Sequence, residues 1–331
     1  MKKILAFIIL SVALVSCYDE YILDYPYTGI YFPYQIDVRT FVVGEGMKVE
    51  VGAALGGVRE NTIDRNVSFI FDNALLAPAL AKMKIASNGY IKIPATPVVT
   101  LLPMPANYYS ITSANTMVIK KGWHNGTVVI KPDSVNFLND SVNTIYSTYA
   151  LPFYITEADA DTILQPKRSN VVGFKFENKL FGKYWHGGAA VVNRPGKSDT
   201  TFIYKTTIPT AESNVWTLTT AGPQVLYTNG YYNLTTTKNE LKIVIKGGNV
   251  YVSAGSTPTY AYTPDGVSTY NNPKLLQKRM LILKYKFTVP LVPVIATSGF
   301  TYHCTDTIAF RNRLRDGTNE WQDENPSHYT K

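Results

Sequence analysis

Cysteine and histidine are scarce in this chain. Its 331 residues include two cysteines, Cys17 and Cys304, and four widely separated histidines, His124, His186, His303 and His328. Adjacent strand residues such as His303 and Cys304 point to opposite faces, so their spacing does not favour a zinc site. No Gly-x-Ser-x-Gly elbow and no phosphate-binding glycine loop is present. The sequence therefore lacks the usual motifs of acyl transfer and nucleotide chemistry, and we expect no cofactor and no metal.

Blocks of like charge are also missing. The 32 basic and 24 acidic residues give a formal net charge of +8, but lysine and arginine are scattered along the chain. The densest basic cluster, Arg311, Arg313 and Arg315, is followed directly by Asp316 and Glu320. A nucleic-acid-binding protein would show a basic stripe or patch. We therefore expect no nucleic-acid partner.

The most continuous apolar run is short and lies at the N-terminus. Met1-Lys2-Lys3 precedes apolar residues 4–15, and Ser16-Cys17 follow, an order typical of a signal peptide and too short for a membrane-spanning helix. Leu14-Val15-Ser16-Cys17 resembles the lipobox of bacterial lipoproteins, in which the cysteine is acylated and the chain is cut just before it. The resemblance implies a lipoprotein signal peptide over residues 1–17 and lipidation of Cys17.

The residues after Cys17 are acidic. Tyr18-Asp19-Glu20 resembles the export signal that directs Bacteroidetes lipoproteins to the outer face of the outer membrane. We therefore expect residues 18–28 to be an acidic tether and the protein to face the cell exterior on a lipid anchor. Only Cys304 then remains, so no intramolecular disulfide can form and core packing must supply the stability.

The remaining chain favours β structure. Its 24 Tyr, 14 Phe, 22 Gly and 19 Pro are spread throughout, and almost no window shows a sustained helical period. Short alternating segments between residues 29 and 155 are typical of an immunoglobulin-like β-sandwich. Residues 116–121 and 127–131 flank Asn125-Gly126, which predicts a hairpin with Trp123 at its tip. The polar stretch 156–170 predicts a linker, so the first domain is expected over residues 29–165.

The second half, residues 166–331, predicts longer strands that pair in sequence order. Gly247-Gly248-Asn249 predicts a turn that makes residues 241–253 a hairpin. A meander of such hairpins closes readily into an up-and-down barrel. The predicted fold class is therefore all-β: an immunoglobulin-like β-sandwich followed by an antiparallel, lipocalin-like β-barrel.

Longer motifs resemble known families. Val43-Gly-Glu-Gly, Leu102-Pro-Met-Pro-Ala-Asn-Tyr-Tyr and Tyr149-Ala-Leu-Pro-Phe-Tyr-Ile resemble an immunoglobulin-like N-terminal domain of unknown function in Bacteroidetes surface lipoproteins. The segments 182–188 and 306–325 resemble the C-terminal domain that often accompanies it. Such proteins are usually encoded in polysaccharide-utilisation systems, beside an outer-membrane transporter. The resemblance implies capture of a polysaccharide or oligosaccharide, with the transporter complex as a partner, and it assigns no binding residue.

Aromatic side chains beside turns are the candidates for sugar contacts, because sugar rings stack their apolar C–H faces on Tyr and Trp. Turn-forming residues place six aromatic side chains in exposed positions: Trp123, Trp185, Tyr231, Tyr232, Tyr260 and Tyr262.

Two polar segments have open interpretations. Glu157, Asp159 and Asp161 could bind calcium, but they lack the glycine and closing glutamate of an EF-hand loop, which favours a solvated linker. The guanidinium groups of residues 311–315 could bind sugar hydroxyls. The favoured interpretation is that they fold the last strand against the barrel through carboxylate pairs, with Trp321 as a plug.

Catalysis is not expected. The chain after residue 166 is much shorter than the roughly 250 residues of an eight-fold catalytic barrel, and no catalytic constellation is apparent. The predicted function is a non-catalytic, cell-surface glycan-binding lipoprotein. The alternative is a structural or adhesive surface lipoprotein without a glycan ligand, and a small hydrolase with an unpatterned carboxylate pair is the least favoured hypothesis.

Overall fold

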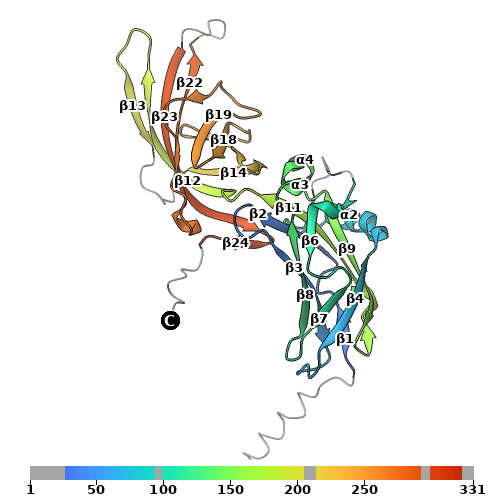
Figure 1. Ribbon diagram of the computed structural model, residues 1–331. Helices are drawn as coiled ribbons and strands as arrows, with labels where there is room; N and C mark the ends of the chain where they lie inside the picture. Colours follow the sequence, from blue (N-terminus) through green and yellow to red (C-terminus); the bar gives the residue numbers. More distant parts are fainter. Residues whose placement is uncertain (1–26, 94–97, 99, 205–213, 292–298, 323–331) are drawn as a thin grey trace, which may run out of the picture.

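The computed structural model describes residues 27–93, 98, 100–204, 214–291 and 299–322, which form two β domains (Figure 1). Cys17 and most of the expected tether lie outside the described residues. Within those residues, no helix is both long and apolar enough to cross a membrane. The predicted fold class is confirmed: a β-sandwich is followed by a nearly closed antiparallel barrel.

The first domain consists of two facing sheets. One sheet has the order β10 (Thr162–Ile163), β1 (Gly29–Tyr31), β3 (Val49–Gly56), β8 (Asn125–Pro132) and β6 (Tyr109–Ile111). The other has the order β2 (Ile36–Val42), β11 (Ser169–Glu177), β9 (Tyr149–Ala158), β4 (Arg65–Phe71) and β7 (Thr116–Ile119), with β5 (Leu102–Pro103) beside β9.

Alternating apolar residues of both sheets form the sandwich core. Phe69 and Phe153 pack with ring centroids 5.2 Å apart, and Phe41 stacks on Phe174 at 5.5 Å. Helix α2 (Leu76–Lys84) covers the outer face of the second sheet with the buried Leu76, Ala79 and Met83. The domain therefore has a main core between its sheets and a smaller one beneath this helix.

Residues 156–170 are not the expected linker. Strand β9 continues to Ala158, and β11 pairs with β9 and, in parallel, with β2 from Val171–Ile36 to Glu177–Val42. The sandwich therefore extends to Glu177, so the domain boundary lies after this residue and not between 165 and 166. This segment contains polar side chains because its short elements lie at the surface.

The hairpin expected around Asn125-Gly126 is also wrong. Strands β7 and β8 belong to opposite sheets, and the turn between them uses Gly122, with φ of +81°. Gly126 instead allows two backbones to approach, because an added Cβ would lie 2.6 Å from the carbonyl carbon of Val118. Trp123 does project from this connection, with 65% of its surface exposed.

The second domain is an up-and-down barrel. Its main strands are β12 (Gly182–Asn193), β14 (Asn214–Gly222), β15 (Val225–Thr228), β18 (Leu241–Lys246), β19 (Asn249–Ala254), β22 (Met280–Pro290) and β23 (Gly299–Arg315), with the short β20 (Thr263–Pro264) and β21 (Thr269–Tyr270) beside β22. The barrel strands neighbour one another in sequence order, as predicted, and the first strand, β12, pairs with the long last strand, β23.

The barrel is closed at one seam by a single bridge between Val250 and Ser268. The predicted hairpin at 241–253 is present as β18 and β19, and Gly247 and Gly248 supply the positive φ angles of its turn. Strand β13 (Thr200–Tyr204) pairs with the second half of β12, and this hairpin projects beyond the short strands β18 and β19 (Figure 1).

The two domains meet at a hairpin formed by the end of β23 and β24 (Thr318–Glu320). Arg313 and Arg315 pair with Glu320 at 2.5 Å within this hairpin, and Arg313 also reaches Glu45 of the first domain at 2.6 Å. The expected arginine–carboxylate pairs are therefore present, but they also join the domains. Trp321 is 58% exposed, so it is not a plug.

Candidate functional site

Eight Tyr and Phe side chains form a continuous cluster in the described part of the second domain, called the aromatic cluster here: Tyr204, Tyr231, Tyr232, Tyr260, Tyr262, Tyr285, Phe287 and Tyr302. Three of its rings are layered. Phe287 and Tyr302 stack at 4.9 Å with an interplanar angle of 7°, and Tyr260 stacks on Phe287 at 5.1 Å and 21°. The rings belong to different strands and loops that the barrel brings together.

Strand alternation explains why these rings point inward. On β22, Leu281, Leu283, Tyr285 and Phe287 are all buried, while the residues between them are more exposed. Phe287 pairs with Tyr302 of β23, so their side chains share one face of the sheet. The segment before β20 adds Tyr260 and Tyr262.

A groove of about 830 Å³ opens beside the layered rings. Tyr260 and Phe287 line it together with polar side chains from three parts of the barrel, Asn193, Lys286, Thr288, Thr301 and His303. His303 is held by Asp265, with 2.8 Å between Nδ1 and Oδ2. Lys286, Thr288, Thr301 and His303 alternate with Phe287 and Tyr302 along their strands, so they project from the other face of the sheet. Tyr260 is the half-buried ring that the groove places beside these hydrogen-bonding groups, and a ring face with polar neighbours is the composition that a sugar requires.

The buried carboxylate of Asp306 holds part of the aromatic cluster in place. Asp306 accepts hydrogen bonds from the hydroxyls of Tyr204 and Tyr285, the latter at 2.5 Å. Burial and the Asp306 charge raise the pKa of Tyr285 well above its ordinary value of 10.0, so this hydroxyl remains a donor. Tyr285 in turn accepts the backbone N–H of Tyr232 at 2.6 Å and fixes that residue at a φ of +48°.

A second buried carboxylate, Glu240, fixes the loop that carries Tyr260 and Tyr262. It accepts hydrogen bonds from the backbone and hydroxyl of Thr259, at 2.8 and 2.7 Å, and from the hydroxyl of Tyr262 at 2.8 Å. Burial alone would raise the pKa of Glu240, but these hydrogen bonds outweigh it and lower the pKa. The Glu240 carboxylate therefore anchors this loop, and both of its oxygens accept hydrogen bonds from it.

The six aromatic candidates differ in burial and in position. Tyr231 and Tyr262 are buried, with 7% and 3% of their surface exposed, so the expectation that they are exposed is wrong. Tyr232 and Tyr260 are half-buried members of the same cluster. The sequence prediction missed Phe287 and Tyr302, although the alternation along residues 280–289 indicated which residues share a face.

Two candidates lie elsewhere. Trp185 is half-buried on the opposite face of β12 from the inward-facing Tyr184, and the guanidinium of Arg311 lies 4.6 Å from its ring centroid. Trp123 is in the first domain, on the connection between β7 and β8. The structure therefore brings together four of the six candidates and leaves two apart.

The described residues contain no group of three or more His, Cys, Asp or Glu side chains that could hold a metal ion. Asp159 and Asp161 are engaged by protein groups: Asp159 accepts from the Asn66 backbone at 2.8 Å, and Asp161 from the Thr28 backbone at 2.6 Å. Cys304 is buried in the barrel, and burial raises the pKa of its thiol.

Comparison with known proteins shows similarity in fold. A family model described only as an N-terminal domain matches residues 25–162. A crystal structure from Bacteroides ovatus, described as structural genomics, unknown function, is 18% identical with a TM-score of 0.66, and the match covers 91% of this chain and 99% of that one. Its likeness shows that the two-domain fold is shared.

Two further Bacteroides ovatus structures are 14% and 13% identical, each with a TM-score of 0.44, covering 89% of this chain and 100% of theirs. One is described as of unknown function and the other as a multidomain protein including DUF1735. No curated protein matches the chain.

Proposed function

We propose that this protein is a non-catalytic, cell-surface glycan-binding lipoprotein of a polysaccharide-utilisation system. In this proposal Cys17 carries the lipid anchor at the outer membrane, and the second domain holds a polysaccharide or oligosaccharide. The observation that carries the proposal is the layered stack of Tyr260, Phe287 and Tyr302 beside a groove with polar side chains. An outer-membrane transporter complex is the proposed partner.

The groove suits a carbohydrate for physical reasons. Tyr260 is the half-buried outer ring of the stack, so it can offer a ring face, while Thr288 and Thr301 offer hydroxyls within 3.0 Å of each other. Stacking one sugar on one ring contributes on the order of 1 kcal/mol. One or two rings with several hydrogen bonds would give a dissociation constant between about 1 μM and 1 mM. Such an affinity suits capture followed by release.

Alanine substitution of Tyr260 tests this site. A glycan array would identify a polysaccharide ligand, and affinity electrophoresis would then compare wild type, Tyr260→Ala and the control Tyr251→Ala. Tyr251 is an exposed ring on β19 of the same barrel, outside the groove. We expect Tyr260→Ala to weaken binding about tenfold, equivalent to about 1.4 kcal/mol, and Tyr251→Ala to have little effect.

The result would contradict the assignment if both variants bound like wild type while circular dichroism showed them folded. A loss confined to Trp185→Ala would move the site to the outer face of β12, where Arg311 covers part of the ring. A loss confined to Trp123→Ala would move it to the first domain.

The alternative function is structural or adhesive, without a glycan ligand. Exposed apolar side chains on the β12–β13 hairpin, Val191, Phe202 and Ile203, favour a protein contact there. Failure to bind any glycan on the array, together with association of the intact protein that Ile203→Ser abolishes, would support this alternative.

A further inference from the structure

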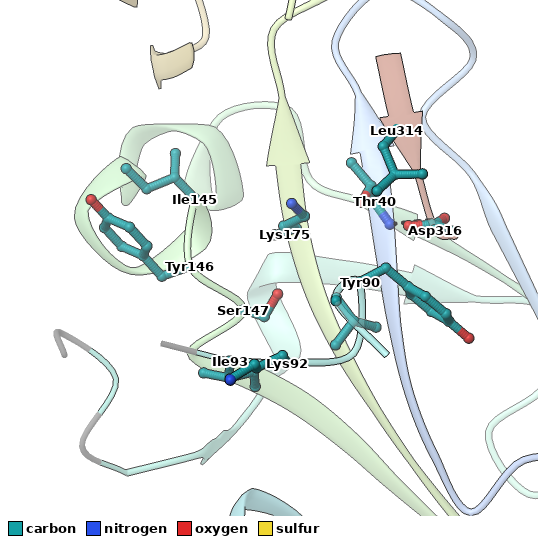
Figure 2. A pocket seen from close by; sticks show the side chains of 12 residues that line it. Thr40, Tyr90, Lys92, Ile93, Ile145, Tyr146, Ser147, Lys175, Leu314 and Asp316 are labelled. Atoms are coloured by element: carbon teal, nitrogen blue, oxygen red, sulfur yellow. Dashed lines mark hydrogen bonds between the residues drawn. The ribbon is translucent and has the colours of Figure 1, made fainter. Parts of the chain in front are cut away.

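A second hollow, of about 280 Å³, lies where the two domains meet (Figure 2). The first domain lines it with residues from β2, β11 and two loops, and the second domain lines it with Leu314 and Asp316 of the terminal hairpin. In Figure 2 Ile145 and Tyr146 lie on one side, Leu314 and Asp316 on the other, and Lys175 stands on the strand between them. The docked hairpin completes one wall of a hollow that the first domain otherwise lines.

Two lysines line this hollow. The ammonium group of Lys175 lies 3.0 Å from Glu177, whose other oxygen accepts the Thr220 hydroxyl, so Lys175 is held in place. Lys92 is exposed, and none of the ion pairs found in the described part of the chain includes it. An ammonium group without a protein partner is available to an anionic ligand.

The opposite wall supplies a carboxyl group. Asp316 accepts a hydrogen bond from the backbone of Thr40 at 3.3 Å. Its burial raises the pKa of Asp316 despite the nearby Thr40, Arg39 and Lys175. The carboxyl oxygens can accept a hydrogen bond from a ligand hydroxyl.

Unusual backbone angles also occur around the hollow. Ser147 and Asp316 have φ of +57° and +48°, which non-glycine residues seldom adopt. Both residues line the hollow, one from each domain. The φ of Asp316 belongs to the two-residue turn that it forms with Gly317 between β23 and β24. Ser147 is therefore the residue held in a conformation of the kind that collects at binding sites.

We infer that this hollow binds a sugar that carries a carboxylate, of the uronic acid class. The carboxylate would pair with Lys92, while Lys175 stays paired with Glu177 in the wall, and the sugar hydroxyls would meet Ser147 and Asp316. Apolar side chains of Ile145 and Leu314 would contact the C–H groups of the ring. The inference takes from the proposed function only that the ligand is a saccharide, and it places this ligand at a site separate from the aromatic groove.

Isothermal titration calorimetry on the full chain tests the site with glucuronate, and with glucose as the neutral analogue. We expect glucuronate to bind at least fivefold more tightly than glucose, because glucose lacks the charge-assisted contact to Lys92. Lys92→Gln should weaken glucuronate binding at least fivefold. The control Lys82→Gln removes the same charge from an exposed position on α2, and we expect less than a twofold change.

Two further arms separate this site from the aromatic groove. Leu314→Trp enlarges an exposed wall residue and should abolish glucuronate binding by filling the hollow. Tyr260→Ala should leave glucuronate binding unchanged, even where it weakens binding of a polysaccharide. A uronic acid trisaccharide tests whether the hollow accepts the end of a longer chain as well as the free sugar.

Equal affinity for glucose and glucuronate would overturn the inference, as would equal effects of Lys92→Gln and Lys82→Gln. No detectable heat up to about 50 mM glucuronate would also overturn it, because even millimolar affinity would be measured there. None of these outcomes affects the aromatic groove, whose test depends on Tyr260.

Discussion

Glu45 links the two domains through two buried arginines. It lies in the turn between β2 and β3, and its carboxylate accepts Arg279 at 2.7 Å and Arg313 at 2.6 and 3.0 Å. The side chains of Arg279 and Arg313 are only 6% and 2% exposed. Replacing Glu45 by glutamine keeps the shape and removes the charge that these buried guanidinium groups face.

The loss in free energy of unfolding can be estimated from the partners that each arginine keeps after the substitution. Breaking a buried ion pair costs about 3–5 kcal/mol when a charge is left without a partner. Arg313 would keep Glu320 and Arg279 would keep the carbonyl of Lys179, so we expect the lower end, about 3 kcal/mol. At about 2–4 °C per kcal/mol, Glu45→Gln should lower the midpoint of thermal unfolding by roughly 6–12 °C.

Differential scanning calorimetry measures this change, and Glu50→Gln is the control. Glu50 is exposed on β3, and its hydrogen bond to Thr127 is long, at 3.4 Å. A Glu45→Gln midpoint within about 1 °C of the control would refute the reasoning, since a buried pair cannot be lost at so small a cost.

The same pair predicts a pH dependence. Burial raises the pKa of Glu45, but Arg313 and then Arg279 lower it more, so the folded pKa lies below the ordinary value of 4.5. The stability from this group is therefore fully present above pH 4.5 and is lost as the pH falls through the lower, folded pKa. The difference between wild type and Glu45→Gln should shrink over that range, and a constant difference would contradict the ion-pair account.

Two further substitutions and one thiol-labelling experiment have defined expected outcomes. Gly230→Ala should destabilise the barrel by about 3 kcal/mol or more because the new methyl group would overlap Trp216, whereas Gly222→Ala, with ordinary contacts, serves as the control in urea unfolding. Cys304 should resist Ellman's reagent in the folded protein and react fully in guanidinium chloride, and reaction under native conditions would contradict its burial. Cys17→Ala should abolish labelling with a radioactive fatty acid and release the protein from the membrane fraction, and unchanged retention would exclude the proposed anchor.

Much of the barrel could be predicted from the sequence because its determinants are local. Gly247 and Gly248 define a turn, and the segments on either side pair directly across it as β18 and β19. Apart from the pairing of β12 with β23, the other barrel strands pair with strands that are close to them in the sequence, which produces the meander. The first domain was harder, because β2 pairs with β11 across more than a hundred residues, and no local pattern specifies such a partner.

The candidate site could be predicted only in part for the same reason. Tyr260 and Tyr232 were identified by neighbouring turn residues, a local feature. The burial of Tyr231 and Tyr262 depends on Phe287 of β22 and on Glu240, which precedes β18. The lysines of the junction hollow, Lys92 and Lys175, are distant in sequence and line one hollow only because the sandwich folds, and the terminal hairpin then adds Leu314 and Asp316.

The pairing of early strands with late ones has a consequence for how the chain folds. Strand β2 must wait for β11, and β12 must wait for β23, so each domain closes only when its last long strand has been synthesised. Until then, β12 and β22 each lack the neighbour that covers one edge, and exposed edges invite pairing with other chains. Contacts between residues so distant in sequence also slow folding. A chain that ends before β23 would retain these open edges permanently, and we expect it to aggregate.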